Sequence, residues 1–230
     1  MGNKVKYLVG ILIFIGSLST TYGQTLSDHV WYYGTQSKGL YFNMTDNLPV
    51  QVSFPNSMGT GGGAVATDPW SGKVLFYTNG QTVWDANHQV MPNGTGLTGN
   101  PSSNQPAAIS AVPGVPDQYY IFTNSATAAA PGSISYSIVD MSQMGNSTTP
   151  VPGGVVTSKN LGFAGNLTNV AQGMVIVSNT NCDGFWLIVN ESGLANYHAL
   201  SVDAGGFSNL VTTVGLGLPM EAANISYHKG

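Results

Sequence analysis

The 230-residue sequence has no arginine, a single cysteine and very few charges. Charged residues make up 7% of the chain, whereas an ordinary globular domain has roughly 25%. All six basic residues are lysines, and two of them lie at the N-terminus, so 6 − 2 = 4 remain elsewhere against ten acids. A nucleic-acid-binding surface needs clustered cations to neutralise phosphates. The composition therefore excludes nucleic acid as a partner, while 42% hydrophobic residues are enough to form a folded core.

The scarcity of cysteine excludes a fold held together by disulfides, because such a framework needs pairs. The lone Cys182 precedes a predicted strand, and no local signature marks it as a catalytic thiol. We expect it to be a small buried residue. Stability must then come from a hydrophobic core and from sheet pairing.

Residues 1–23 predict a signal peptide. Lys4 and Lys6 form a positively charged N-terminal region, and Tyr7–Gly16 is an apolar run. Thr21 and Gly23 then have the small side chains of a cleavage site. The apolar run is half the length of the about 20 residues that a spanning helix needs, and no later run is long enough. We therefore expect residues 24–230 to be secreted, with an extracellular or outer cell-surface location and no membrane-spanning segment.

Beyond this leader the sequence predicts one all-β domain, residues 24–230, without an internal linker. Short segments rich in aromatic and β-branched residues alternate with Gly, Asn, Asp and Pro, as in sheet proteins. No window longer than about 11 residues keeps the apolar period of a helix. The predicted strands are His29–Tyr33, Gly39–Asn43, Val50–Phe54, Ala64–Thr67, Lys73–Thr78, Thr82–Trp84, Ala107–Ala111, Gln118–Thr123, Ile134–Asp140, Met174–Ser178, Phe185–Asn190, Ala195–Asp203 and Leu210–Val214.

Three segments repeat one pattern: an aromatic and aliphatic strand, a polar turn, and a second strand that ends in aspartate. The segments are Val74–Asn87, Tyr119–Ser142 and Phe185–Gly205, and the aspartates are Asp85, Asp140 and Asp203. Successive copies lie about 45 and about 65 residues apart, and a period of about 40–50 residues with several strands per unit is typical of a β-propeller. We therefore expect a partial β-propeller of repeated antiparallel blades, with a β-sandwich as the alternative.

At this level of detail the sequence resembles a known family, in motifs that occur in the same order and cover most of residues 29–228. The motifs are Trp31–Gly34, Gly39–Asn43, Gly72–Gly99, Gln118–Thr123, Tyr136–Met141, Val156–Asn160 and Cys182–Trp186. They look like the N-terminal β-propeller-like region of Bacteroidetes cell-surface proteins that end in a gliding-motility-associated or type IX secretion sorting domain. The resemblance implies export, a β-propeller and a surface location. It implies no catalytic site.

A complete member of that family would continue past Gly230 into further blades and a sorting domain. The resemblance thus predicts a truncated product or a partial propeller stabilised by its neighbours. A partial propeller leaves an unpaired sheet edge, which favours pairing with another chain. Self-association through that edge is therefore one expectation, and a self-assembling subunit of an extracellular fibre is one candidate function.

The three strand-end aspartates have two interpretations. A pair of carboxylates can hydrolyse glycosidic bonds, but an aspartate that recurs at one place in each repeat is more typical of a residue that caps a turn.

Asn179, Asn181 and Asp183 also have two interpretations, since their spacing matches the first half of a calcium loop. The position for the bidentate glutamate is Asn190, with Glu191 one step away. A polar turn is the favoured interpretation there, and weak calcium binding is the alternative.

Two loops complete the set of candidate features. Gly59–Ala64 is rich in glycine, but a strand follows it where a dinucleotide loop would have a helix, so these glycines predict a bulge or a tight approach near the propeller centre. Trp70 lies in the turn Asp68–Gly72. A tryptophan in a loop is expected to be exposed, whereas those in strands are expected in the core. Trp70 is therefore the candidate contact for a partner or a glycan.

These observations predict an exported, non-enzymatic surface protein. Its expected function is that of a binding or adhesion module for other surface proteins or glycans. The fibre subunit is the alternative, and a secreted propeller hydrolase is a weaker one because no convergent acid–base set is visible. No cofactor is expected apart from the calcium alternative.

Overall fold

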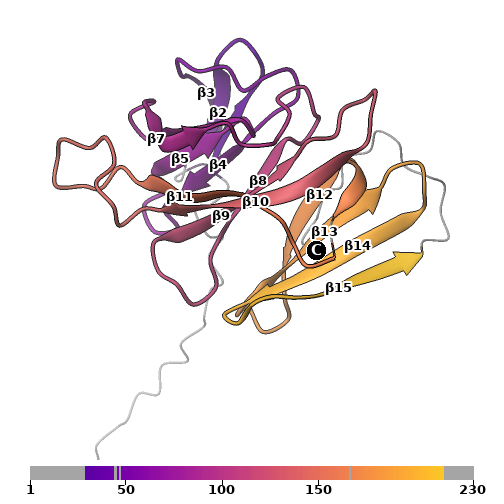
Figure 1. The fold of residues 1–230 in the computed structure, drawn as a ribbon. Coiled ribbons are helices and arrows are strands. Elements are labelled where there is room, and N and C mark those ends of the chain that lie inside the picture. Colours follow the sequence, from indigo (N-terminus) through magenta and orange to yellow (C-terminus); the bar gives the residue numbers. More distant parts are fainter. Residues whose placement is uncertain (1–28, 44–45, 47, 166, 215–230) are drawn as a thin grey trace, which may run out of the picture.

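The computed structural model describes residues 29–43, 46, 48–165 and 167–214, and all regular structure in these residues is β (Figure 1). The described residues contain no helix, and hence none long and apolar enough to cross a membrane. The predicted signal peptide, residues 1–23, lies outside them. The expectation of an all-β fold with antiparallel sheets is confirmed.

The fifteen strands of the described residues form four groups of chain neighbours that pair antiparallel. Group 1 comprises β1 (Val30–Tyr33), β2 (Lys38–Phe42) and β3 (Pro49–Ser53). Group 2 comprises β4 (Ala64–Thr67), β5 (Val74–Thr78), β6 (Thr82–Asp85) and β7 (Val90–Thr95). Group 3 comprises β8 (Ala107–Ala111), β9 (Gln118–Asn124), β10 (Gly132–Asp140) and β11 (Val155–Leu161). Group 4 comprises β12 (Thr168–Ser178), β13 (Phe185–Glu191), β14 (Asn196–Asp203) and β15 (Gly206–Val214).

Groups 3 and 4 are hydrogen-bonded to each other. β10 pairs with β12 at Gly132↔Val170 and Ser133↔Thr168, so that β8–β15 make one eight-stranded sheet. In Figure 1 the indigo and violet strands of groups 1 and 2 lie on one side of β10, and the orange and yellow strands of group 4 lie on the other. The first strands of the groups are neighbours in chain order, because β1 contacts β4, β4 contacts β8 and β8 contacts β12.

The core lies between consecutive groups, whose faces pack against each other. Alternate side chains of a strand point to opposite faces, and the fully buried neighbours Phe76 and Tyr77 of β5 enter different hydrophobic clusters. The Tyr77 ring packs edge-on against Tyr32 of group 1, with centroids 5.0 Å apart, and Phe76 packs against Tyr119 of group 3 at 5.5 Å. A third cluster fills the space between groups 3 and 4.

All thirteen predicted strands are present, but the prediction misses β7 and β11. Both strands lie at the edge of their group, and their sequences contain Pro, Gly or Asn where a central strand would be apolar. They contact each other through side chains that no local pattern anticipates. The amide of Asn93 donates to the Val156 carbonyl (2.9 Å), and the Lys159 ammonium donates to the Thr95 carbonyl (2.8 Å).

The three repeated segments correspond to the hairpins β5–β6, β9–β10 and β13–β14, and their aspartates cap turns as expected. Asp85 Oδ1 accepts the N–H of Asn87 (2.9 Å) and of Gln89 (3.0 Å). Asp140 Oδ1 accepts the N–H of Ser142 (2.9 Å), and Asp203 Oδ1 accepts the N–H of Gly205 (2.7 Å). Each carboxylate thus completes the turn that follows its own strand.

In the glycine-rich loop before β4, the structure shows the tight approach, one of the two expected alternatives. A Cβ on Gly61 would overlap the carbonyl oxygen of Ser103, and one on Gly63 would overlap the Thr78 carbonyl and the Met58 side chain. A Cβ on Gly62 would meet nothing closer than the Asn104 carbonyl oxygen, 3.8 Å away. The loop thus allows group 2 to approach the segment that leads into β8.

The lone Cys182 does not follow the expectation of burial. It is exposed and has a positive φ of 57°, in a turn where its N–H donates to the Asn179 carbonyl (3.1 Å). The tight turn before β13 places this side chain in solvent, because the strand that would bury it begins three residues later.

The loss of stability on removal of a capping aspartate should depend on how deeply that aspartate is buried. Asp85 is 1% exposed, so Asp85→Ala leaves two backbone donors without their partner, and we expect a loss of about 1–3 kcal/mol in the free energy of unfolding. Asp203→Ala, at an exposed turn, should cost less than about 1 kcal/mol. Asp85→Asn keeps an acceptor oxygen and should recover much of the loss. Urea denaturation measures all three, and equal costs at Asp85 and Asp203 would contradict the structure.

The glycine loop predicts opposite outcomes at adjacent positions. Gly61→Ala forces the backbone away from Ser103 and should lower the free energy of unfolding by about 3 kcal/mol or more. Gly62→Ala has room for its methyl group and should be neutral or stabilising by up to about 1 kcal/mol. Thermal unfolding of the two variants provides the comparison, with Gly62→Ala as the matched control. A destabilised Gly62→Ala protein would show that the loop is not packed in this way.

Candidate functional site

Trp70 lies in the turn between β4 and β5 and is 88% exposed, as expected for a tryptophan in a loop. Asp68 fixes this turn, because its Oδ1 accepts the N–H of Trp70 (3.1 Å) and both the N–H (2.6 Å) and the hydroxyl (2.8 Å) of Ser71. The N–H of Asp68 also donates to the Lys73 carbonyl (2.8 Å). The indole is therefore presented to solvent from an ordered backbone.

The same hydrogen bonds set the charge of the turn. The bonds from the Ser71 hydroxyl and the Ser71 N–H stabilise the carboxylate form, and the nearby Lys73 ammonium adds to them. Together they hold the pKa of Asp68 below its usual value of 3.8. A negative charge thus stays next to Trp70 throughout the neutral range.

A cleft of about 360 Å³ opens beside this turn. Three segments far apart in the sequence form its walls: the β4–β5 turn with the start of β5, the β6–β7 turn, and the β10–β11 loop. Concave sites with apolar walls and a few placed polar groups are typical of ligand binding. The polar residues are Asp68, Ser71, Lys73, Asn87, Ser147 and Thr149, and the apolar ones are Val74, Leu75, Ala86, Met141, Val151 and Pro152.

The β10–β11 loop forms one wall of the cleft and is held by hydrogen bonds that its backbone and the Asn146 side chain donate. The N–H of Gly153 donates to the Met144 carbonyl (3.0 Å), and the amide of Asn146 donates to the Val90 carbonyl of β7 (2.6 Å). This geometry leaves Val151 71% exposed and Met144 47% exposed. Val151 lines the cleft, so that an apolar side chain of the cleft wall is in solvent, and Trp70 is exposed on the β4–β5 turn next to the lining residue Ser71.

The chemistry of the cleft suits recognition. The apolar wall of the cleft can bind the flat face of a ligand, while hydroxyl and amide side chains can hydrogen-bond to its polar edge. Hydrolysis of a glycosidic bond needs two carboxyl groups about 5–9.5 Å apart. Asp68 is the only carboxylate among the residues that line the cleft, and its Oδ1 already accepts three hydrogen bonds within the turn.

Sequence reasoning found the exposed Trp70 but missed the residues that line the cleft beside its turn. The β10–β11 loop contains the Pro- and Gly-rich stretch Pro150–Gly154, which is a signal for a loop but says nothing of what the loop faces. Asn87 lies in the turn that Asp85 caps, and no pattern in the sequence relates it to Ser147. Only packing of group 2 against group 3 brings these residues into one cleft.

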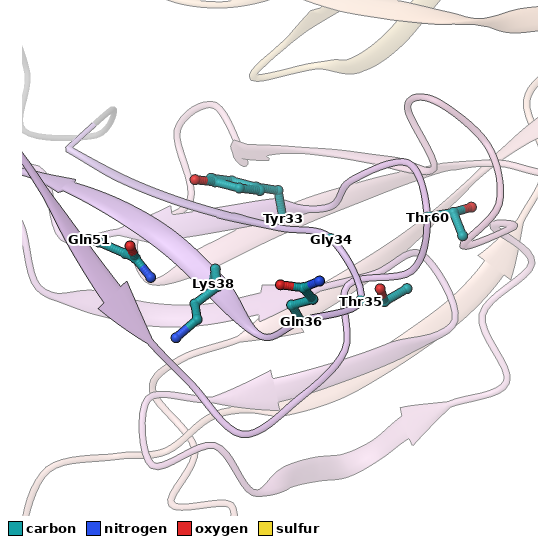
Figure 2. Close-up of a pocket in the computed structure, with 7 residues that line it drawn as sticks. All are labelled: Tyr33, Gly34, Thr35, Gln36, Lys38, Gln51 and Thr60. Atoms are coloured by element: carbon teal, nitrogen blue, oxygen red, sulfur yellow. The ribbon is translucent and has the colours of Figure 1, made fainter.

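A second concavity, of about 580 Å³, lies at the β1–β2 turn. Figure 2 shows side chains that line it from β1, the turn, β2 and β3, with Gln51 and Thr60 at opposite ends. Its one charged group, the Lys38 ammonium, donates to the Ser53 hydroxyl (3.0 Å). Tyr33 is its only aromatic residue. This groove offers fewer apolar contacts to a ligand than the cleft beside Trp70.

The candidate calcium loop forms a turn held by its own side chains. The Asn179 amide nitrogen donates to Asp183 Oδ1 (2.6 Å), and the N–H of Asp183 donates to Asn179 Oδ1 (3.2 Å). Asn181 is exposed in this turn. Among the described residues no group of three or more His, Cys, Asp or Glu side chains is placed to hold a metal ion. The polar turn accounts for all these contacts, and calcium binding stays an untested alternative.

The lowered pKa of Asp68 predicts how the Trp70 turn responds to acid. A carboxyl whose pKa is lower in the folded state stabilises that state above its unfolded pKa and loses this effect as pH falls through the folded value. The Ser71 amide resonance should therefore titrate below pH 3.8, the usual value. Ser71→Ala should move this midpoint upward, with the fold intact at neutral pH. A Ser71 amide that titrates at or above the usual carboxyl value would contradict the geometry.

Comparisons of this chain with protein-family models, with curated proteins and with solved structures found no match. The resemblance to a Bacteroidetes surface-protein region therefore stays an expectation from the motifs. What is known of the site comes from the geometry of the turn, the cleft and the loop.

Proposed function

We propose that this protein is an exported, non-enzymatic binding module of β-propeller type that binds glycans at the cell surface through Trp70 and the adjoining cleft. The observation that carries the proposal is the indole of Trp70, 88% exposed on a turn that Asp68 holds in place. An indole displayed in this way offers a large, flat apolar surface whose burial by a ligand is favourable.

A glycan fits the cleft better than a protein partner does. A protein interface needs about 800 Å² from each side, whereas a cleft of about 360 Å³ accommodates one or two sugar rings. The flat apolar face of a sugar suits the indole, and its hydroxyls suit the short polar side chains of Asn87, Ser147 and Thr149.

The propeller assignment rests on the arrangement of the four groups. Groups 2, 3 and 4 each have four antiparallel strands in chain order, and the first strands of all four groups follow one another in contact. Blades that share a central axis have this arrangement, and each would need neighbours on both sides. The finer assignment, a partial β-propeller in preference to a β-sandwich, is part of the proposal.

Two further observations support the rest. Asp85, Asp140 and Asp203 cap turns, and none of them lines the cleft, which favours a non-enzymatic role. The leader pattern of residues 1–23 and the resemblance to surface proteins with sorting domains support export to the cell surface. Adhesion to a glycan-coated surface is the corresponding biological role.

The proposal predicts that the protein purified after export binds members of a glycan array and that Trp70→Ala abolishes this binding. Titration calorimetry on a glycan from the array should show at least a tenfold loss of affinity, because a central aromatic contact contributes about 2 kcal/mol. The unfolding temperature should not change, since the indole is almost wholly in solvent. Thr149→Val, on the cleft wall, should weaken binding less.

Trp31→Ala is the matched control, because Trp31 is also exposed but lies on group 1, away from the cleft. Its affinity for the same glycan, measured per protomer, should equal that of the unchanged protein. Absence of glycan binding, or equal affinity in Trp70→Ala, would refute the proposal. Glycan turnover by the unchanged protein would instead favour the hydrolase alternative.

A further inference from the structure

Two of the three hydroxyl groups that line the cleft beside the Trp70 turn donate their hydrogen within their own loop. Ser71 donates to Asp68 Oδ1 (2.8 Å), and Ser147 donates to the Val151 carbonyl. A hydroxyl has one hydrogen to donate and two lone pairs that accept, so these oxygens can still accept a bond from a ligand. Most of the donors for a ligand must therefore come from other side chains of the cleft.

Asp68, Lys73 and Asn87 keep polar atoms for a ligand. Asp68 Oδ1 accepts the three hydrogen bonds of the Trp70 turn, and its Oδ2 accepts none from the described residues. The Lys73 ammonium and the Asn87 side-chain amide likewise form no hydrogen bond within the part of the chain that the structure describes. All three residues line the cleft. The cleft thus offers an acceptor, a donor and an amide that is both.

The free ammonium of Lys73 distinguishes it from the other two lysines of the described residues. Lys38 donates to the Ser53 hydroxyl (3.0 Å), and Lys159 donates to the Thr95 carbonyl (2.8 Å). Lys73 is exposed and is the only cation among the residues that line the cleft. Because one lysine and one aspartate line the cleft, its net charge is zero.

Asp68 and Lys73 lie opposite each other at the base of the Trp70 turn. Their neighbours Thr67 and Val74 are partners in the pairing of β4 with β5, and the Asp68 N–H donates to the Lys73 carbonyl (2.8 Å). The hydrogen bonds from Ser71 are the main cause of the lowered pKa of Asp68, and the charge of Lys73 adds to them. A carboxylate and an ammonium are therefore presented together at one end of the cleft.

We propose, on the basis of the proposed glycan binding, that Asp68 and Lys73 select an uncharged sugar by contacting two of its adjacent hydroxyl groups. A carboxylate only accepts hydrogen bonds and an ammonium only donates them, whereas a hydroxyl does both. A pair of hydroxyls therefore satisfies Asp68 Oδ2 and Lys73 Nζ together. The carboxylate of a uronate that approaches Lys73 also approaches Asp68, and the ammonium of an amino sugar that approaches Asp68 also approaches Lys73, so that like charges repel. The net charge of −4 further disfavours acidic glycans.

Titration calorimetry on matched sugars tests this selection. Each neutral glycan that the exported protein binds on the array is compared with its uronate counterpart, in which a carboxylate replaces a hydroxymethyl group, and with its amino-sugar counterpart. The unchanged protein should bind the neutral glycan at least about tenfold more tightly than either charged one.

Asp68→Asn separates recognition from the shape of the turn. Asparagine keeps the Oδ1 acceptor that the Trp70 turn requires, and it replaces Oδ2 by a donor. The affinity for the neutral glycan should fall about tenfold, and the preference over the uronate should be lost, because the charge of Lys73 is then unopposed. A purely structural role of Asp68 would lower both affinities by the same factor. The unfolding temperature verifies that the variant is folded.

Lys73→Met is the complementary variant. It should also weaken binding of the neutral glycan by about tenfold, and it should remove the discrimination against the amino sugar. Lys38→Met is the matched control, because it removes the same charge from group 1, away from the cleft. Its affinities for the neutral and the charged glycans should equal those of the unchanged protein.

Several results would overturn the selection by Asp68 and Lys73. They are a uronate or an amino sugar that the unchanged protein binds as tightly as the neutral glycan, an unchanged preference in Asp68→Asn, and an equal loss of both affinities in that variant. Each of these leaves the proposed function intact where Trp70→Ala still abolishes glycan binding. Absence of glycan binding by the unchanged protein would refute both.

Discussion

The structure depends on β5, whose two central side chains serve two different parts of the core. Phe76 and Tyr77 are both fully buried, and because strand neighbours point to opposite faces, one packs toward group 3 and the other toward group 1. Each middle group therefore joins its neighbours on both sides. With so few charges and no disulfide in the described residues, this face-to-face contact is the main source of stability.

The scarce carboxylates have a consistent use in this fold. Asp68, Asp85, Asp140 and Asp203 each accept backbone N–H groups of the turn that follows them. When the aspartate accepts the N–H groups of a turn, the turn keeps its shape without hydrophobic contacts to the rest of the protein. The loops at the ends of the strands stay ordered for this reason. The display of Trp70 is one consequence, since the turn that exposes the indole is the turn that Asp68 closes. The pKa of Asp140 is lowered for the same reason, by bonds from the Ser142 hydroxyl and the Gln143 amide.

The exposure of a strand tryptophan depends on whether another group packs on its side of the sheet. Trp84, in a strand of group 2, is 8% exposed, whereas Trp31, in a strand of group 1, is 54% exposed. The sequence predicts a core position for both, because both lie in predicted β-strands. Their exposed fractions differ because Trp84 belongs to a hydrophobic cluster between groups 1 and 2, whereas Trp31 lies on the outer face of group 1.

The sequence by itself determined the all-β class, thirteen of the strands, the hairpins of the repeat and their capping aspartates, because period-two patterning and Asx turns are local. It also placed Trp70 in an exposed turn. Only the tertiary structure decided that the β10–β11 loop and Asp68 line one cleft, that the edge strands β7 and β11 contact each other, and which strand residues stay exposed among those that the structure describes. Edge strands and cleft walls are held by contacts between residues more than 50 positions apart, such as Asn93 with Val156 and Asn146 with Val90. A local pattern has no information on such contacts, since they exist only once the groups have packed.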